Sequence, residues 1–372
     1  MIYADNAATT KLDEDALEKM RRCIEEYGNA SQPYSFAREP KKILKEARSV
    51  IAGCIGAKEN EIFFTSGGTE SDNWVIKEYA ASKKFNCHIV TTRIEHHAVL
   101  NAVKAVEALG TDVSYIDVDS TGLINRSEYS RHLGHEGLVS VMFSNNEVGT
   151  LQPIRDICRE AHEKNYLFHT DAVQAVGHID IDVNELGIDF LSASAHKFNG
   201  PKGTGFLYIR DGVLLPQFMS GGAQEFGCRA GTENVAGIAA MAVALLNNCK
   251  NLHSNKLLLE RIEDSFIAEL DALNVKYVRN GNSNHAPGNI SISFPGIDGE
   301  VLLHRLDLKG ICVSTGSACD SKRTQISHVL LAMGIPSEVA ESTIRISFGK
   351  NNSEKDGIII AKAIYEIIEQ LK

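Results

Sequence analysis

Short apolar segments alternate with helical windows along the first half of the chain, and this alternation constrains the fold more than any other feature. The apolar segments have the length and the β-branched and aromatic content of strands, and they lie at 61–65, 88–92, 112–116, 138–143 and 166–170. Helical windows lie between most of them. Strands and helices in alternation form a sheet that helices cover on both faces. The sequence therefore predicts an α/β fold with a mostly parallel sheet.

The 372 residues are too many for one small hydrophobic core, so we expect two unequal domains. In the last third of the chain the pattern changes to half-buried strands at 289–294 and 343–348 with helices between them. We predict a large domain over residues 13–250. A smaller α+β domain should comprise residues 1–12 and 251–372.

Composition and charge argue against several classes of protein. The formal net charge of -10 disfavours non-specific binding to nucleic acid or to an anionic membrane. The longest apolar run, 235–246, is shorter than the roughly 18 residues of a membrane span, and we expect no signal peptide because the first residues run straight into polar ones. The 8 cysteines contain no CxxC pair. We therefore expect no metal site and a reducing, cytoplasmic environment.

Polar residues follow the predicted strands and should meet in one cleft, because ligands bind at the carboxyl ends of parallel strands. They combine hydroxyl, imidazole, carboxyl, amide and amine groups: Gly68, Thr69, Glu95, His96, His97, Asn145, Asn146, Glu147, Asp171, Gln174, Ser194, His196 and Lys197.

Lys197 lies in a turn between two apolar segments, 190–193 and 206–209, that have the pattern of strands. An amine removed from water loses its proton more easily and can react with an aldehyde cofactor. The alternative is a solvated lysine on a surface hairpin, which this stretch alone does not exclude.

A second turn, at 66–73, follows the first predicted strand and opens a helix. A helix start offers unpaired backbone N–H groups and partial positive charge, so Gly68 and Thr69 are suited to bind a phosphate. A simple helix cap is the alternative.

Together these groups match the parts of pyridoxal 5′-phosphate. Lys197 would meet the aldehyde, Asp171 would keep the ring nitrogen protonated, and His96 would stack on the ring. Three side chains would surround the phosphate: Thr69, Ser194 and His196. Taken singly, Asp171 has a simpler interpretation as a strand-end cap and His96 as a satisfied polar histidine.

Eight motifs carry these residues: YADNAATT at 3–10, FTSGGTESDN at 64–73, EHHAV at 95–99, NNEVG at 145–149, HTDAVQ at 169–174, SAHK at 194–197, RAGTEN at 229–234 and GSAC at 316–319. They span nearly the whole chain. The chain thereby resembles cysteine desulfurases of the NifS/IscS type, in the class V aminotransferase superfamily of fold-type I pyridoxal phosphate enzymes. The resemblance implies a large cofactor-binding domain and a smaller α+β domain.

The resemblance also assigns roles to the residues of the cleft. Lys197 would bind the cofactor covalently, Asp171 and Gln174 would contact its ring nitrogen and phenolic oxygen, and His96 would stack on its ring and act in catalysis. The phosphate would lie among Gly68, Thr69, Ser194 and His196.

Three further residues follow from the resemblance. Asn146, which would also contact the cofactor, and Arg345 would hold the carboxylate of the substrate, L-cysteine. Thr232 would reach the phosphate of a neighbouring subunit, which implies a homodimer.

Cys319 separates a desulfurase from an aminotransferase within this family. It lies in a small, polar stretch between a predicted strand at 311–314 and a helix near His328, where we expect a loop that can bring a thiol to the cofactor and away again. The resemblance implies that Cys319 takes the sulfur of L-cysteine as a persulfide, leaves L-alanine, and passes the sulfur to an acceptor for iron-sulfur cluster or thiolation pathways. A selenocysteine lyase, a class V aminotransferase or a scaffold without activity are the alternatives.

The chain departs from the family pattern at Tyr34, at Phe226 and directly after Cys319. Lys322 and Arg323 add positive charge there. We predict that this charge favours the Cys319 thiolate and guides an acidic acceptor protein.

Overall fold

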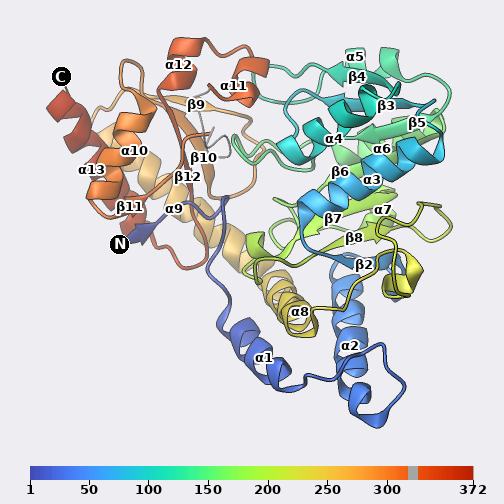
Figure 1. Ribbon diagram of the computed structural model, residues 1–372. Coiled ribbons are helices and arrows are strands. Elements are labelled where there is room, and N and C mark those ends of the chain that lie inside the picture. The colour runs from blue at the N-terminus through green and yellow to red at the C-terminus, as the bar shows by residue number, and fades with distance from the viewer. Residues whose placement is uncertain (317–325, 372) are drawn as a thin grey trace.

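The computed structural model describes residues 1–316 and 326–371. A seven-stranded sheet forms the centre of the larger part (Figure 1). Its strand order is β2-β8-β7-β6-β5-β3-β4, and β8 runs antiparallel to the six others. The bounds are β2 Ile62–Thr65, β3 His88–Thr92, β4 Asp112–Ile116, β5 Gly137–Ser140, β6 Tyr166–Asp171, β7 Phe190–Ser194 and β8 Gly205–Ile209. The predicted α/β fold with a mostly parallel sheet is confirmed.

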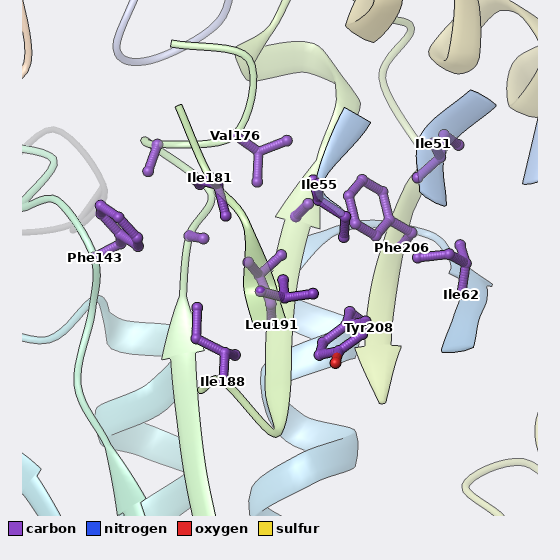
Figure 2. Packing of buried hydrophobic residues seen from close by; sticks show 14 of the residues in the cluster. Ile51, Ile55, Ile62, Phe143, Val176, Ile181, Ile188, Leu191, Phe206 and Tyr208 are labelled. Carbon is purple, nitrogen blue, oxygen red and sulfur yellow. The ribbon is translucent and has the colours of Figure 1, made fainter. Parts of the chain in front are cut away.

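Helices cover both faces of this sheet, because neighbouring residues of each strand point to opposite sides. Leu191 packs with α2, α6 and α8, whereas Phe190 packs with α3 and α4. Figure 2 shows the first of these cores, where Ile55, which directly follows α2, lies beside Phe206. The helices of this part are α1 Glu14–Glu25, α2 Arg38–Cys54, α3 Gly68–Ser82, α4 His97–Glu107, α5 Arg126–His132, α6 Ile154–Glu163, α7 Val183–Leu186 and α8 Val235–Lys250.

The smaller part contains two short sheets and a group of helices (Figure 1). One sheet pairs the start of the chain, β1 Ile2–Tyr3, in parallel with β11 Ile311–Cys312. The other is antiparallel, in the order β12-β10-β9, with β9 Val278–Asn280, β10 Asn289–Ser293 and β12 Thr343–Ser347. Its helices are α9 Leu252–Ala272, α10 Gly299–Leu308, α11 His328–Ala332, α12 Ser337–Glu341 and α13 Glu354–Leu371.

We propose the domain division 13–250 against 1–12 and 251–372, because separate hydrophobic clusters support it. The cluster of the smaller part includes Ala4 and buried residues of α9, α10 and α13. The clusters that flank the large sheet are built from residues 12–249.

Within the described residues, no single helix is long and apolar enough to cross a membrane. The helices α8 and α9 would pass such a test only when counted together, and they are bent by 72° at their junction. Among the same residues, no group of three or more His, Cys, Asp or Glu side chains is placed to hold a metal ion.

Candidate active site

A cavity of about 340 Å³ lies at the carboxyl ends of the parallel strands, where the smaller part meets the sheet. Predicted site residues from distant parts of the sequence line it together: Gly68, Thr69, His96, Asn146, Asp171, Gln174, Ser194, His196, Lys197 and Arg345. Thr232 is exposed and is not part of this lining. Cys319 lies outside the described residues, but Gly316, three positions before it, lines the cavity. A larger cleft of about 910 Å³ along α9 contains none of the predicted site residues.

Lys197 ends a single 3₁₀ turn, Ala195–Lys197, that follows β7 directly. The turn is compact because the Gly200 N–H bonds to the Ala195 carbonyl at 2.8 Å, and a Cβ on Gly200 would lie 2.7 Å from that of Ala195. The Lys197 Nζ donates to the carbonyls of Ala7 and Ala8 at 2.6 and 3.0 Å. The lysine therefore faces the cavity and the first residues of the chain, and not the outer surface of a hairpin.

Asp171 is the last residue of β6, with 6% of its surface exposed. Its Oδ1 accepts a hydrogen bond from the Val173 N–H at 2.9 Å. Burial raises the pKa of Asp171, whereas His96 when protonated, the Val173 hydrogen bond and the charge of Lys197 lower it. With a neutral His96, the hydrogen bond and the lysine charge are what favour the ionised carboxyl.

Two histidines of the cavity are neutral. His96 caps the start of α4, and its Nδ1 accepts from the Ala98 N–H at 3.1 Å, so that nitrogen carries no proton. Burial lowers the pKa of His96. Burial also lowers the pKa of His196 to about 4, and its Nδ1 lies 3.1 Å from the Thr9 hydroxyl. Neutral imidazoles suit ring stacking and hydrogen bonding more than charge pairing.

The start of α3 forms part of the cavity wall, beside Val173 and Ser194. Gly67 has φ 152°, a conformation that favours glycine, and precedes the first helical residue, Gly68. A Cβ on Gly68 would lie 2.4 Å from a methyl group of Val173, so a larger residue would not fit. The Ser194 hydroxyl approaches the same turn, at 3.3 Å from where a Cβ of Gly67 would be. Backbone N–H groups and hydroxyls therefore gather where an anion can bind.

Arg345 of β12, in the smaller part, supplies a positive charge to the cavity wall. Its guanidinium donates to the Asn146 carbonyl at 2.9 Å and to Asp5 Oδ1 at 2.7 Å. Among the described residues its buried Nε has no hydrogen-bond partner. A guanidinium fixed in this way can present a donor to a carboxylate.

The sequence interpretation gave no role to two features of the site. The first is the segment Ala7–Thr10, whose carbonyls accept from Lys197 and from Gln174 Nε2, the latter at 2.9 Å. Backbone acceptors leave no side-chain signal in a sequence. The second is Asp72, which lines the cavity. It follows Thr69 by three residues, so helical spacing places both on one face, and this signal was available.

Asp72 is a second buried carboxyl of the cavity, and the charge of Asp171 acts on it. Burial and the charge of Asp171 raise its pKa well above the ordinary value. Its Oδ1 has no hydrogen-bond partner in residues 1–316 and 326–371 and lies 3.6 Å from Nε2 of His169. The charge of Asp171 therefore opposes the ionisation of Asp72 in this buried site.

This arrangement can hold an aldehyde cofactor with an anionic group, together with an amino acid. The amine, the helix start and the buried carboxyl would bind the cofactor, and the guanidinium would bind the substrate carboxylate.

Comparisons with known proteins agree with this chemistry. The family model for aminotransferase class-V matches residues 2–357. A cysteine desulfurase IscS of Clostridium botulinum is 44% identical over 99% of this chain and 94% of its own length. A NifS-like protein of known structure superposes with a TM-score of 0.94 at 38% identity, with 99% of both chains covered. The structure of SspA in complex with cysteine gives a TM-score of 0.83 at 33% identity over 94% of this chain and 99% of that one.

These relatives extend over nearly the whole chain, with no large insertion or missing part on either side. The predicted resemblance is confirmed: the chain belongs to the class V aminotransferase family, and within it to the cysteine desulfurases.

Proposed function

We propose that this chain binds pyridoxal 5′-phosphate in the 340 Å³ cavity and converts L-cysteine to L-alanine, with the sulfur left as a persulfide on Cys319. One observation carries the proposal. A lysine amine, a buried carboxyl, a glycine helix start and an arginine line the same cavity, and Gly316 brings the Cys319 segment to it.

The residues present fit this cofactor. The cavity has a helix start at Gly68 where a side chain would collide with Val173, which suits a phosphate against bare backbone. Ser194 and His196 add neutral polar groups beside it. When bound, the cofactor supplies an electron sink that stabilises negative charge on the substrate Cα. Asp171 would keep the ring nitrogen protonated, and Gln174 and Asn146 would orient the ring, with His96 stacked on it.

The side chains of the cavity divide the remaining tasks. Arg345 would hold the substrate carboxylate, helped by Asn146, whose carbonyl it contacts. A substrate held there would present its Cα–H bond to the lysine side of the cavity, which Lys197 lines together with Arg345. Lys197 Nζ, once free of the cofactor, would take the Cα proton and return it later.

Sulfur transfer requires the Cys319 thiolate, which is the reactive form of the thiol. It attacks the sulfur of the bound L-cysteine, so that a new S–S bond forms while the C–S bond of the substrate breaks. The electron pair of the C–S bond stays with the carbon fragment, which takes up protons and leaves as L-alanine. Atoms and electrons balance without an added oxidant.

Partner interactions complete the proposal. Thr232 is exposed in the single chain and absent from its own cavity lining, which supports a role toward the phosphate site of a second copy. We therefore propose a homodimer. The persulfide would pass to an acceptor protein, such as an iron-sulfur scaffold, in the cytoplasm, where thiols stay reduced.

The experiment that tests the function compares the wild type with Cys319→Ala. We expect the wild-type protein to release equimolar alanine and sulfide from L-cysteine with a thiol reductant present. The variant should keep its cofactor absorbance and lose sulfide release. Cys312→Ala, a half-buried cysteine of β11, is the matched control and should retain activity. Undiminished turnover by Cys319→Ala would instead favour a lyase or an aminotransferase.

A further inference from the structure

Glu147 is a buried carboxyl beside the cavity, and the proposed function gives this residue no role. Only 5% of its surface is exposed. It lies in the turn after β5, which Asn145 holds in place by accepting from the N–H groups of Glu147 and Val148 at 2.8 and 3.0 Å. The Asn145 side chain is itself fixed by the Ile94 carbonyl at 2.9 Å. The Glu147 carboxyl therefore has a rigid base.

One oxygen of Glu147 touches both ends of the segment that contains Cys319. The Ser327 hydroxyl donates a hydrogen bond to Oε2. On the other side, the backbone of Gly316 lies so close that a Cβ there would meet the same Oε2 at 2.2 Å. Residues 316 and 327 are thereby brought together at a single carboxylate oxygen.

Ser327 connects this contact to a well-packed helix. Its hydroxyl oxygen accepts from the N–H groups of Val329 and Leu330 at 3.1 and 3.2 Å, which caps the start of α11. Val329 and Leu330 are buried in a cluster that includes Val148, the neighbour of Glu147. Because Ser327 uses its oxygen as an acceptor toward the helix, its proton is directed to Glu147.

Opposing influences leave the pKa of Glu147 close to neutral pH. Burial raises its pKa to about 7, while the Ser327 hydrogen bond and the charge of Arg345 act against that rise. Arg345 is itself shared with Asp5. From the other elements around it, Ser327 and the Gly316 backbone contribute no charge, so within residues 1–316 and 326–371 Arg345 is the cation that faces this carboxyl.

We propose that Glu147 is a positioning residue for sulfur transfer, because it fixes both ends of the chain segment that carries Cys319. This inference rests on the proposed function. Cys319 follows Gly316 by three residues, so at most about 11 Å of extended chain separates them. Fixing Gly316 at the cavity wall therefore limits where the thiol can be when it meets the substrate sulfur.

The test uses the holoenzyme and four variants, with persulfide formation on Cys319 followed by mass spectrometry in a single turnover. Glu147→Gln and Ser327→Ala should slow this step about 10-fold or more, since a misplacement of about 1 Å can be that costly. Ser327→Thr keeps the hydroxyl and should stay within about 3-fold of the wild type. Glu61→Gln is the matched control. It changes another buried carboxyl, which accepts from the N–H groups of Lys58 and Asp211 and does not line the cavity.

Two measurements separate positioning from damage to the fold. The spectral change when L-cysteine binds, which precedes sulfur transfer, should have the wild-type midpoint in Glu147→Gln and Ser327→Ala. The wild-type rate should also rise as Glu147 ionises through about pH 7, because the anion is the stronger acceptor for Ser327. Glu147→Gln should lack that component of the pH profile.

The outcomes distinguish this inference from the function it rests on. If Glu147→Gln forms the persulfide at the wild-type rate and with an unchanged pH profile, the role of Glu147 is overturned. The desulfurase proposal would still stand. A wild-type protein that forms no persulfide on Cys319 overturns both. Loss of L-cysteine binding in Ser327→Thr as well as in Ser327→Ala would show a general disturbance of the cavity and would also contradict the inference.

Discussion

The two walls of the cavity are built in different ways. The sheet wall consists of side chains at or just beyond the ends of strands, such as Asp171, the last residue of β6, and Lys197, which ends the turn after β7. The opposite wall consists of segments that meet only in the folded chain. Arg345 pairs with Asp5 across 340 positions, and the Lys197 amine reaches the Ala7 carbonyl across 190.

The two walls differ both in the groups they hold and in what fixes those groups. The sheet wall holds the groups that would bind the cofactor, and regular secondary structure fixes them. The opposite wall holds the groups that would position the substrate and the Cys319 segment, and long-range contacts fix them. Changes in the sheet wall should therefore affect the chemistry itself, whereas changes in the opposite wall should affect binding and alignment.

The largest effect is expected for Lys197→Ala in the sheet wall. Without the amine, activity toward L-cysteine should fall by at least about 10³-fold, because both cofactor attachment and proton transfer are lost. The measurement is alanine formation, together with borohydride reduction followed by peptide mapping. Lys202→Ala, an exposed lysine of the following loop, should behave as the wild type. In the wild-type protein, borohydride should trap the cofactor on Lys197. Trapping on another residue would contradict the assignment.

The two carboxyls of the sheet wall should differ from each other. Asp171→Asn should lower kcat by about 100-fold or more, because the amide cannot keep a ring nitrogen protonated. Asp72→Asn should stay within about 3-fold of the wild type. Burial and the charge of Asp171 raise the pKa of Asp72, which favours its protonated form, and an amide is a close neutral substitute for a protonated carboxyl. Kinetics and cofactor absorbance against pH check both; equal losses would refute this division of roles.

Arg345→Ala in the opposite wall should chiefly raise KM for L-cysteine. We expect about a 100-fold loss in kcat/KM, because a buried, charge-assisted contact to the substrate carboxylate disappears and leaves Asp5 unpaired. Arg345→Lys should recover only part of it. Arg305→Ala, exposed on α10, serves as the control. A fall in kcat with unchanged KM would place Arg345 in the chemistry instead.

The smallest effects concern stability, where histidines of the two parts should respond to pH in opposite directions. Burial lowers the pKa of His169 in β6 to about 3, so its contribution is present above pH 6.5 and is lost as the pH falls toward 3. The hydrogen bond with Glu263 raises the pKa of His285, so its contribution is present below pH 6.5 and is lost as the pH rises through the raised pKa.

Melting temperatures of His169→Gln and His285→Gln between pH 4.5 and 9 test this contrast. The first variant should show a flatter acid slope than the wild type. The second should be destabilised by a few degrees at pH 6 and by less at pH 9. Parallel pH curves for the wild type and both variants would contradict the opposite responses.

Much of this architecture could be predicted because it depends on local patterns. Alternating apolar segments predicted the parallel sheet, and the rule that ligands bind at the carboxyl ends of parallel strands predicted that Gly68, Asp171 and Lys197 would meet. Asp72 was missed although its spacing from Thr69 was visible, because the cavity that it faces was not. Cys319 and its neighbours Lys322 and Arg323 lie outside the described residues, so their predicted roles remain predictions.

The sequence by itself determined the elements, the order of polar groups along the strand ends and the family to which the chain belongs. Each of these is encoded in stretches of a few residues whose conformation or chemistry is set by near neighbours. Only the tertiary structure decided that Glu147 touches both Gly316 and Ser327, and that the first residues of the chain hold the Lys197 amine. Such contacts arise when separate cores pack together, and no local pattern records which distant residue will arrive.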